Sequence, residues 1–212
     1  MAVVVLACGI TATRPGWREV PAMPGKSDLD PLLATAPDRV VVVGTDADLA
    51  AVVLRLLRTE RLDRAVGFVP ADRRRSAVAG LWGLPRDALD FAVDGDPVPI
   101  PLVRDDSGGV LVGRGRIGPV DGEAYCDDQL ALRGRAAAIE VTPDSGGGVH
   151  GRVVHGGLLR RVRSYRGRAF QVGCHPTTVT SDGVEHPRPV RRWTWYRHTE
   201  DLRAVAVPGV RG

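Results

Sequence analysis

The stretch Val40–Leu49 constrains the fold of this chain more than any other. Four consecutive valines run directly into a glycine, a threonine and two aspartates. A short apolar run of β-branched residues is typical of a strand that is covered on both faces of a parallel sheet. The apolar residues that follow recur at helical spacing, with arginines on the opposite face. Since another apolar run, Ala65–Val69, comes next, the pattern predicts a strand–helix–strand unit.

The turn between this strand and this helix is the first candidate site. In an open parallel sheet, phosphate ligands bind beyond the carboxyl ends of the strands and against helix N-termini. The candidate nucleotide-binding residues of the turn are Gly44, Thr45, Asp46 and Asp48. We interpret Asp46 and Asp48 also as candidate magnesium ligands, because Mg²⁺ prefers carboxylate oxygens. A structural alternative stays open, in which Thr45 or Asp46 only caps the helix.

The periodicity changes along the chain and predicts two domains. Residues 1–92 alternate valine-rich runs with helical patterns, whereas residues 93–212 contain short β-like runs between glycine, proline and aspartate turns. We therefore expect a small parallel-sheet α/β domain followed by an antiparallel β-sandwich-like domain. Within the first domain, Thr11–Lys26 is rich in proline and glycine and predicts a loop. The last two predicted strands are Val190–Tyr196 and Leu202–Val207.

The Gly44–Leu49 turn also carries a family resemblance. An α/β half with a Gly/Asp turn, followed by an all-β half with a Ser-Asp-Gly segment, resembles the diacylglycerol kinase catalytic-domain family, which includes bacterial lipid kinases and is related in fold to NAD kinases. The family's nucleotide motif is Gly-Gly-Asp-Gly-Thr followed by leucine, and Gly44, Asp46 and Leu49 match it. Thr45 and Ala47 replace glycines, so each adds a Cβ where a phosphate would approach the main chain.

A second stretch keeps the frame of another family motif, Pro-x-Gly-Thr-x-Asn-Asp-Phe-Ala. Pro70 follows a predicted strand, and Ser76 opens a predicted helix. The loop after this strand is expected to face the same crevice as the Gly44 turn, and its candidate cofactor-binding residues are Arg73, Arg74, Arg75 and Ser76. Guanidinium groups can hold a phosphate through two parallel hydrogen bonds. A run of solvated charges is the alternative interpretation of the three arginines.

A third stretch, Asp182-Gly183, is similar to the family's Asp-Gly-Glu segment. Val184 takes the glutamate position, and Glu185 follows one residue later. The resemblance implies that Asp182 and Glu185 are the catalytic residues. Because side chains alternate between the two faces of a strand, a shift by one residue turns the Glu185 carboxylate to the opposite face in an extended segment.

These motifs lead to three functional hypotheses. The first is a diacylglycerol kinase-like protein with a degraded ATP-phosphate motif, a weakly active or inactive pseudoenzyme that binds a nucleotide, phosphate or lipid ligand. The second is an active kinase that uses ATP and magnesium to phosphorylate a lipid or a small hydroxyl compound. The third is a non-enzymatic interaction protein, in which a homodimer could form through an exposed β edge.

Composition limits the partners and the compartment. The formal net charge is +4, and Lys26 is the only lysine. Acidic residues are mixed with the arginines except at Arg73–Arg75 and between Arg152 and Arg168, so the pattern disfavours nucleic-acid binding. The three cysteines are widely spaced and odd in number, which favours reduced thiols in a bacterial cytoplasmic protein.

Two features of the sequence bear on membrane contact. No apolar run is long enough to span a bilayer. Trp193 and Trp195 alternate with charged residues, so they predict either a peripheral membrane patch or a pair of core residues on one face of a strand. The sequence favours the core.

Overall fold

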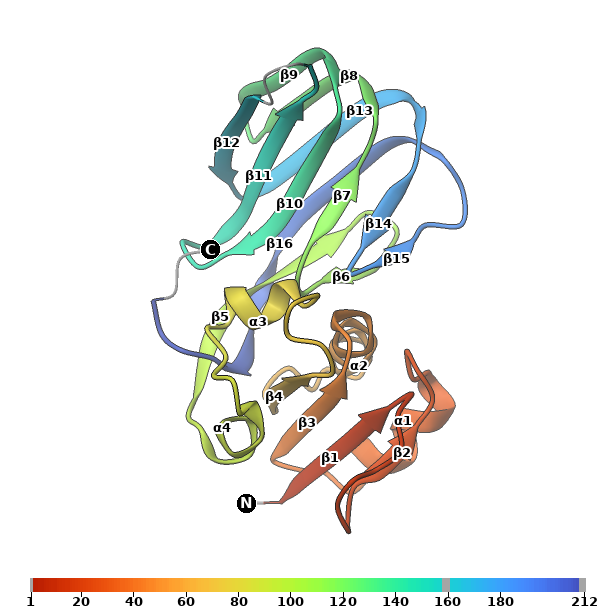
Figure 1. Cartoon of the computed structure of the whole chain (residues 1–212), viewed down its shortest axis with the longest axis vertical. Coiled ribbons are helices and arrows are strands. Elements are labelled where there is room, and N and C mark those ends of the chain that lie inside the picture. Colours follow the sequence, from red (N-terminus) through yellow and green to blue (C-terminus); the bar gives the residue numbers. More distant parts are fainter. Residues whose placement is uncertain (1, 158–160, 210–212) are drawn as a thin grey trace. The chain divides into compact units, whose positions relative to one another are not determined.

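The computed structural model describes residues 2–157 and 161–209 and divides into two compact units. Unit 1 comprises Met1–Ile100 together with Glu200–Gly212, and unit 2 comprises Pro101–Thr199. Unit 1 contains a parallel sheet with helices, and unit 2 contains antiparallel strands (Figure 1). The predicted combination of a parallel-sheet α/β part with an antiparallel β part is confirmed.

Unit 1 is built on a parallel sheet with the strand order β2-β1-β3-β4. The strands are β1 (Val3–Cys8), β2 (Arg18–Val20), β3 (Arg39–Gly44) and β4 (Ala65–Pro70), and the helices are α1 (Lys26–Leu33), α2 (Asp46–Arg58), α3 (Ala77–Leu81) and α4 (Ala88–Asp94). Every residue of β3 is buried, as expected for a central strand. Helix α2 buries a leucine and valine face, which includes Leu49, Val52 and Leu56.

Two elements of unit 1 differ from the sequence expectation. Strand β2 lies within Thr11–Lys26, so the predicted loop is wrong for these three residues. Arg18 and Glu19 are exposed, and β2 is held by its ladder with β1, in which Leu6 lies opposite Arg18. Helix α4 was not predicted, and its carboxyl end is bound by a residue from β3. The Arg39 guanidinium is buried and donates to the carbonyl oxygens of Ala92, Val93 and Gly95.

Unit 2 consists of two layers of antiparallel strands. Its strands are the second part of β5 (Pro97–Asp105), then β6 (Val110–Leu111), β7 (Gly115–Ile117), β8 (Val120–Cys126), β9 (Gln129–Ala136), β10 (Ala138–Asp144), β11 (Gly148–His155), β12 (Arg161–Gly167), β13 (Ala169–Thr177), β14 (Val179–Ser181), β15 (Val184–Glu185) and the first part of β16 (Val190–Val205). One layer has the order β16-β13-β8-β9, and the other has the order β12-β11-β10-β7-β14-β15.

The core of unit 2 contains the two tryptophans of the predicted aromatic strand. Trp193 is 4% exposed and Trp195 is fully buried, and their rings meet edge to face. Phe170 lies opposite Trp195 in the ladder between β13 and β16. These tryptophans therefore belong to the core and do not form a peripheral membrane patch.

Strand β16 is continuous, whereas the sequence predicted two separate strands in its place. Its first part pairs with β13 in unit 2, and its last part belongs to unit 1, where Ala204 lies opposite Val66 of β4. The chain therefore returns to the parallel sheet after it has completed the antiparallel layers.

Candidate functional site

The turn after β3 is closed by a reciprocal pair of hydrogen bonds. Thr45 is the N-cap of α2, and its hydroxyl accepts the backbone N–H of Asp48 at 3.3 Å. The Asp48 carboxylate in return accepts the backbone N–H and the hydroxyl of Thr45, each at 2.7 Å. This is the capping-box arrangement. The capping role that the sequence left open for Thr45 is thus the one observed.

Asp48 also ties a distant loop to the same helix end. Its second carboxylate oxygen accepts the backbone N–H of Met23 at 2.6 Å. Asp48 is itself buried. The pKa of the neighbouring Cys8 thiol is raised to about 12, mainly because the thiol is buried and in addition because of the negative charge of Asp48. Gly44 leaves room for this carboxylate, because a Cβ at Gly44 would lie 2.6 Å from the Asp48 Oδ2 atom.

Asp46 points to a different helix, α3. Its Oδ1 atom accepts the hydroxyl of Ser76 at 2.5 Å, and its Oδ2 atom accepts the backbone N–H groups of Ala77 at 2.7 Å and Val78 at 3.3 Å. The Ser76 hydroxyl accepts the N–H of Ala79 at 3.0 Å. The first three N–H groups of α3, which have no partner inside the helix, are therefore all bound by Asp46 and Ser76.

The three arginines lie on the turn that leads from β4 into α3. All three are exposed. Arg73 donates to the backbone oxygen of Pro85 at 2.9 Å, so its guanidinium is directed along the surface to the loop after α3. Within the described part of the chain, the side chains of Arg74 and Arg75 make no hydrogen bond or ion pair. The turn itself is adjacent to the first candidate site, since Ala71 donates its N–H to the Gly44 oxygen at 2.7 Å.

Asp182 and Glu185 lie in unit 2, on the hairpin between β14 and β15. Asp182 and Gly183 have φ angles of 51° and 88°, the positive pair that a tight type I′ hairpin requires. The Asp182 carboxylate is buried and accepts the backbone N–H groups of Val112, Gly113 and Arg114 at 2.7–3.0 Å. Glu185 is exposed on β15. Through these hydrogen bonds, Asp182 connects the β14–β15 hairpin to the segment before β7.

A pocket that the sequence did not reveal lies at the carboxyl ends of β1 and β2. It has a volume of about 330 Å³, and its lining is Gly9, Ile10, Thr11, Glu19, Val20 and Pro21. Gly9 has a φ of 63°, and a Cβ there would lie 2.9 Å from that of Ala22, so the chain needs glycine at this bend. The glycine after the first apolar run was the available signal. Among the described residues that line this pocket, Glu19 alone is charged.

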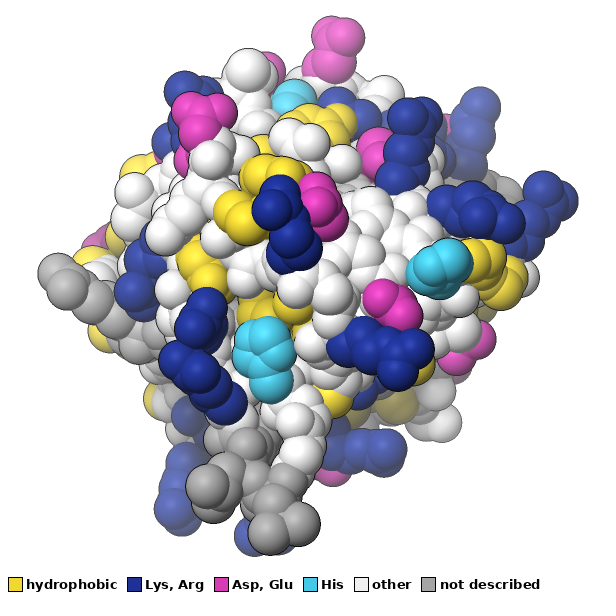
Figure 2. All heavy atoms as spheres, turned by 90° about the horizontal axis from the view of Figure 1, so that it is seen from above, with side chains coloured by type: hydrophobic (Ala, Val, Ile, Leu, Met, Phe, Trp, Pro, Cys, Tyr) yellow, Lys and Arg dark blue, Asp and Glu magenta, His cyan; other side chains and the backbone are white. Residues whose placement is uncertain are grey.

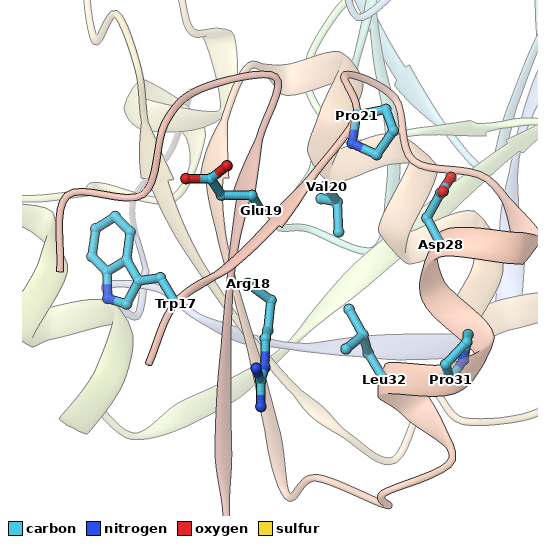
Figure 3. A pocket seen from close by; sticks show the side chains of 8 residues that line it. All are labelled: Trp17, Arg18, Glu19, Val20, Pro21, Asp28, Pro31 and Leu32. Atoms are coloured by element: carbon cyan, nitrogen blue, oxygen red, sulfur yellow. The ribbon is translucent and has the colours of Figure 1, made fainter. Parts of the chain in front are cut away.

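A second pocket of about 330 Å³ lies between β2 and α1. Figure 3 shows Val20 and Leu32 directed toward one another from the strand and the helix, with Arg18 and Glu19 on opposite sides of the strand. Trp17, Pro21, Asp28 and Pro31 complete the lining. The charged groups are one guanidinium and two carboxylates, and Asp28 already accepts the N–H of Gly25 at 2.8 Å.

The described residues contain neither a metal-binding cluster nor a helix suited to span a membrane. Within 2–157 and 161–209, no three histidine, cysteine or carboxylate side chains are grouped as a metal ion would require. Among the same residues, no helix combines the length and apolar content needed to cross a bilayer. Figure 2 shows basic and acidic side chains intermixed on the viewed face.

The arrangement of strands and helices matches solved structures along nearly the whole chain. A diacylglycerol kinase from Bacillus anthracis str. Sterne aligns with a TM-score of 0.73 over 99% of this chain and 98% of its own, at 12% identity. The chain has the diacylglycerol kinase fold. An NAD kinase from Archaeoglobus fulgidus, in complex with ATP, aligns with a TM-score of 0.54 over 94% of this chain and 92% of its own, at 13% identity.

The diacylglycerol kinase fold is therefore shared at very low sequence identity. A yeast NADH kinase complexed with NADH aligns with a TM-score of 0.52 over 98% of this chain and 84% of its own, at 7% identity. No protein-family model and no curated protein matches the sequence. The likeness thus shows the fold, and the chemistry depends on the residues of this chain.

Proposed function

We propose that this protein is a ligand-binding protein of the diacylglycerol kinase fold in which phosphoryl transfer is lost or severely reduced. The main support is that the carboxylates that would bind magnesium already accept hydrogen bonds from the protein. Both oxygens of Asp46 and both oxygens of Asp48 accept hydrogen bonds from backbone or hydroxyl donors of the protein. A metal ion would have to displace these donors, several of which come from buried or half-buried groups.

The helix ends near the turn give a second support. Phosphate binding at a helix N-terminus uses backbone N–H groups that are not yet paired. At α3, the N–H groups of Ala77, Val78 and Ala79 are already paired with Asp46 and Ser76. At α2, Asp48 adds a negative charge to the first turn, and this charge repels a phosphate in the absence of a metal ion.

The pocket at the carboxyl ends of β1 and β2 is the site that we assign to the ligand. Open α/β sheets bind their ligands at this end of the strands. Its lining contains the carboxylate of Glu19 and no basic side chain. This charge pattern favours a small uncharged or cationic ligand over a triphosphate.

The proposal is tested with the full chain, ATP and magnesium. We expect no ADP formation with dispersed diacylglycerol as acceptor, and no rise in Tm with millimolar ATP and magnesium beyond that given by magnesium sulfate at the same ionic strength. A ligand held at a hundredfold excess over its Kd would stabilise the fold by about 2.7 kcal/mol, which a melting curve resolves easily. Adenosine, which keeps the base and sugar of ATP but lacks the charged phosphates, serves as the comparison ligand.

A restored variant makes the test sharper. Thr45→Gly, Ala47→Gly and Asp48→Thr together recreate the Gly-Gly-Asp-Gly-Thr pattern, whereas Ala47→Gly alone is the matched control that keeps the capping box. We expect the triple variant to gain affinity for ATP while its Tm falls, because it loses the Thr45–Asp48 bonds. Steady ADP formation by the unmodified protein that disappears in Asp46→Asn would overturn the proposal.

A further inference from the structure

The β11–β12 hairpin carries the most basic segment of the chain. Between Ser145 and Ser181 the sequence contains no aspartate or glutamate, although it contains Arg152, Arg161, Arg163, Arg166 and Arg168. The proposed function uses none of these residues. Most of these arginines lie on β12 or directly after it.

Strand β12 lies at the edge of its sheet, and its first half is exposed on both faces, whereas Tyr165 in its second half packs against the core of unit 2. It pairs with β11 on one side, with Val162 opposite Val154 and Ser164 opposite Arg152, and it is the terminal strand of the sheet order (Figure 1). Its first four residues, Arg161–Ser164, are all exposed, which is true of no other strand within the described residues. A strand normally buries at least one face, so the Arg161–Ser164 half of β12 has an uncovered ladder edge and uncovered side chains.

Strand β9, the terminal strand of the other layer, provides an internal comparison. Its exposed arginines are neutralised by neighbours on β8: Arg133 pairs with Glu123 and Arg135 pairs with Asp121, each at 2.9 Å. On β12, by contrast, the side chains of Arg161 and Arg163 make no ion pair or hydrogen bond within the described part of the chain. Only Arg166 has an acidic neighbour, Asp144, at 3.4 Å. The unpaired positive charge of β12 therefore has no counterpart on β9.

The same charges determine which partner can pair with this edge. A second copy of the chain would place arginine against arginine, and like charges opposite one another destabilise a ladder. An extended acidic segment would instead form backbone hydrogen bonds with β12, while carboxylates at every second position would meet Arg161 and Arg163, which share one face. Val162 is 37% exposed and offers an apolar contact on the opposite face.

We propose that β12 is a docking edge for an acidic, extended segment of another protein, which adds to the sheet as an additional strand. The binding energy comes from the backbone ladder, and the selectivity comes from the two unpaired guanidinium groups. This interaction is independent of the ligand site assigned above, because all its residues lie in unit 2.

The test uses a fluorescent heptapeptide, Glu-Val-Glu-Val-Glu-Val-Glu, and the full-length protein. Its anisotropy should rise with protein concentration, and the affinity should fall as NaCl is raised from about 50 to 500 mM, since exposed ion pairs are screened by salt. A lysine peptide of the same pattern should not bind. The acidic peptide with N-methyl groups on alternate amides keeps its charge but cannot complete a ladder, and it should bind at least about tenfold more weakly.

Two protein variants separate the edge from net charge. Arg161→Ser with Arg163→Ser should weaken peptide binding by about fivefold to tenfold, as expected for the loss of two exposed ion pairs. Arg133→Ser with Arg135→Ser removes the same charge from β9 and should leave binding unchanged. All four residues are exposed, so both variants are expected to keep the Tm of the parent.

Several outcomes would overturn the proposal. Equal binding of the N-methylated peptide would mean that charge alone drives association. Tighter binding of phosphatidylglycerol vesicles or of single-stranded RNA than of the peptide would assign the edge to a lipid surface or a nucleic acid. A dimer in light scattering that the β12 variant abolishes would assign it to a second copy of the chain.

Discussion

The Oδ2 atom of Asp46 lies 2.7 Å from the backbone nitrogen of Ala77, thirty-one positions along the chain. With Ser76 bound to the other oxygen, Asp46 joins the first turn of α2 to the first turn of α3. The residue that matches the central aspartate of the kinase motif therefore stabilises a contact between two helices. Asp46, which was predicted from its carboxylate chemistry as a candidate magnesium ligand, therefore has a structural role that can be measured.

Replacing Asp46 by alanine is expected to lower the free energy of unfolding by about 2–4 kcal/mol, because three buried or half-buried donors lose their acceptor. Asp46→Asn, which keeps one acceptor oxygen, should cost less. Urea denaturation followed by circular dichroism measures both. The loss should be the same with magnesium and with EDTA. A loss that appears only when magnesium is present would contradict the structural role.

Asp182 and Glu185 should behave very differently, although the resemblance implies a catalytic role for both. Asp182→Ala removes the acceptor of three backbone N–H groups and should cost about 2–4 kcal/mol of stability. Glu185→Gln changes an exposed side chain and should stay within about 0.5 kcal/mol of the parent. Thermal unfolding of the two variants side by side is the measurement. Similar Tm values for both would refute the role given to Asp182.

Gly44→Ala should destabilise the protein through a close contact. The added Cβ meets the Asp48 Oδ2 atom at 2.6 Å, so the carboxylate has to move away from Thr45 or Met23. We expect a cost of about 1–3 kcal/mol, in the range of overpacked sites. The matched control is Gly80→Ala on α3, where nothing lies within 4 Å of the new Cβ. Helix propensity should make this control neutral or stabilising.

Alkaline pH should weaken the fold through the Cys8 thiol. Its pKa is raised from 9.0 to about 12 in the folded chain, first by burial and then by the Asp48 charge. The unfolded chain loses this proton at lower pH than the folded chain does, so stability is intact below about pH 9 and falls as the pH rises toward 12. Titration of this thiol lowers the free energy of unfolding by at most about 1.4 kcal/mol per pH unit. This contribution to the pH dependence, measured by urea denaturation between pH 8 and pH 11, should disappear in Cys8→Ala.

Thiol reactivity provides an independent check on the same residue. Cys8 and Cys126 are buried, and the pKa of Cys126 is raised to about 11 by burial and by Asp127. Cys174 is half-buried, with a pKa raised by burial. With Ellman's reagent at pH 8, Cys174 should react first. Fast labelling of Cys8 in the native protein would show that the helix end it packs against is open.

Local sequence patterns predicted the central strand β3 and helix α2 of unit 1, but not its edge strand β2. The valine run and the helical spacing after Gly44 were sufficient to predict β3 and α2, because both elements bury a regular apolar pattern. Strand β2 has only three residues, two of them charged and exposed, so it leaves no pattern to recognise. Its position follows from pairing with β1, which is a property of the folded chain.

In the candidate site, too, contacts between residues close in sequence could be predicted, whereas contacts between distant residues could not. The two residues of the capping box, Thr45 and Asp48, are three positions apart, so the motif can be recognised from sequence. The bonds from Asp46 to Ser76 and from Asp48 to Met23 join positions that are 30 and 25 residues apart. No local pattern encodes such distant partners. The sequence singled out Asp46 and Asp48 as candidates, and only the structure shows which groups their carboxylates bind.

Strand β16 has a practical consequence for any attempt to divide this protein. A chain cut after Thr199 would lack the stretch that lies beside Val66, so β4 would become a bare edge and unit 1 would be incomplete. A fragment beginning at Pro101 would carry that stretch without the sheet it belongs to. Autonomous halves would therefore require splicing the C-terminal strand onto the first hundred residues rather than simple truncation.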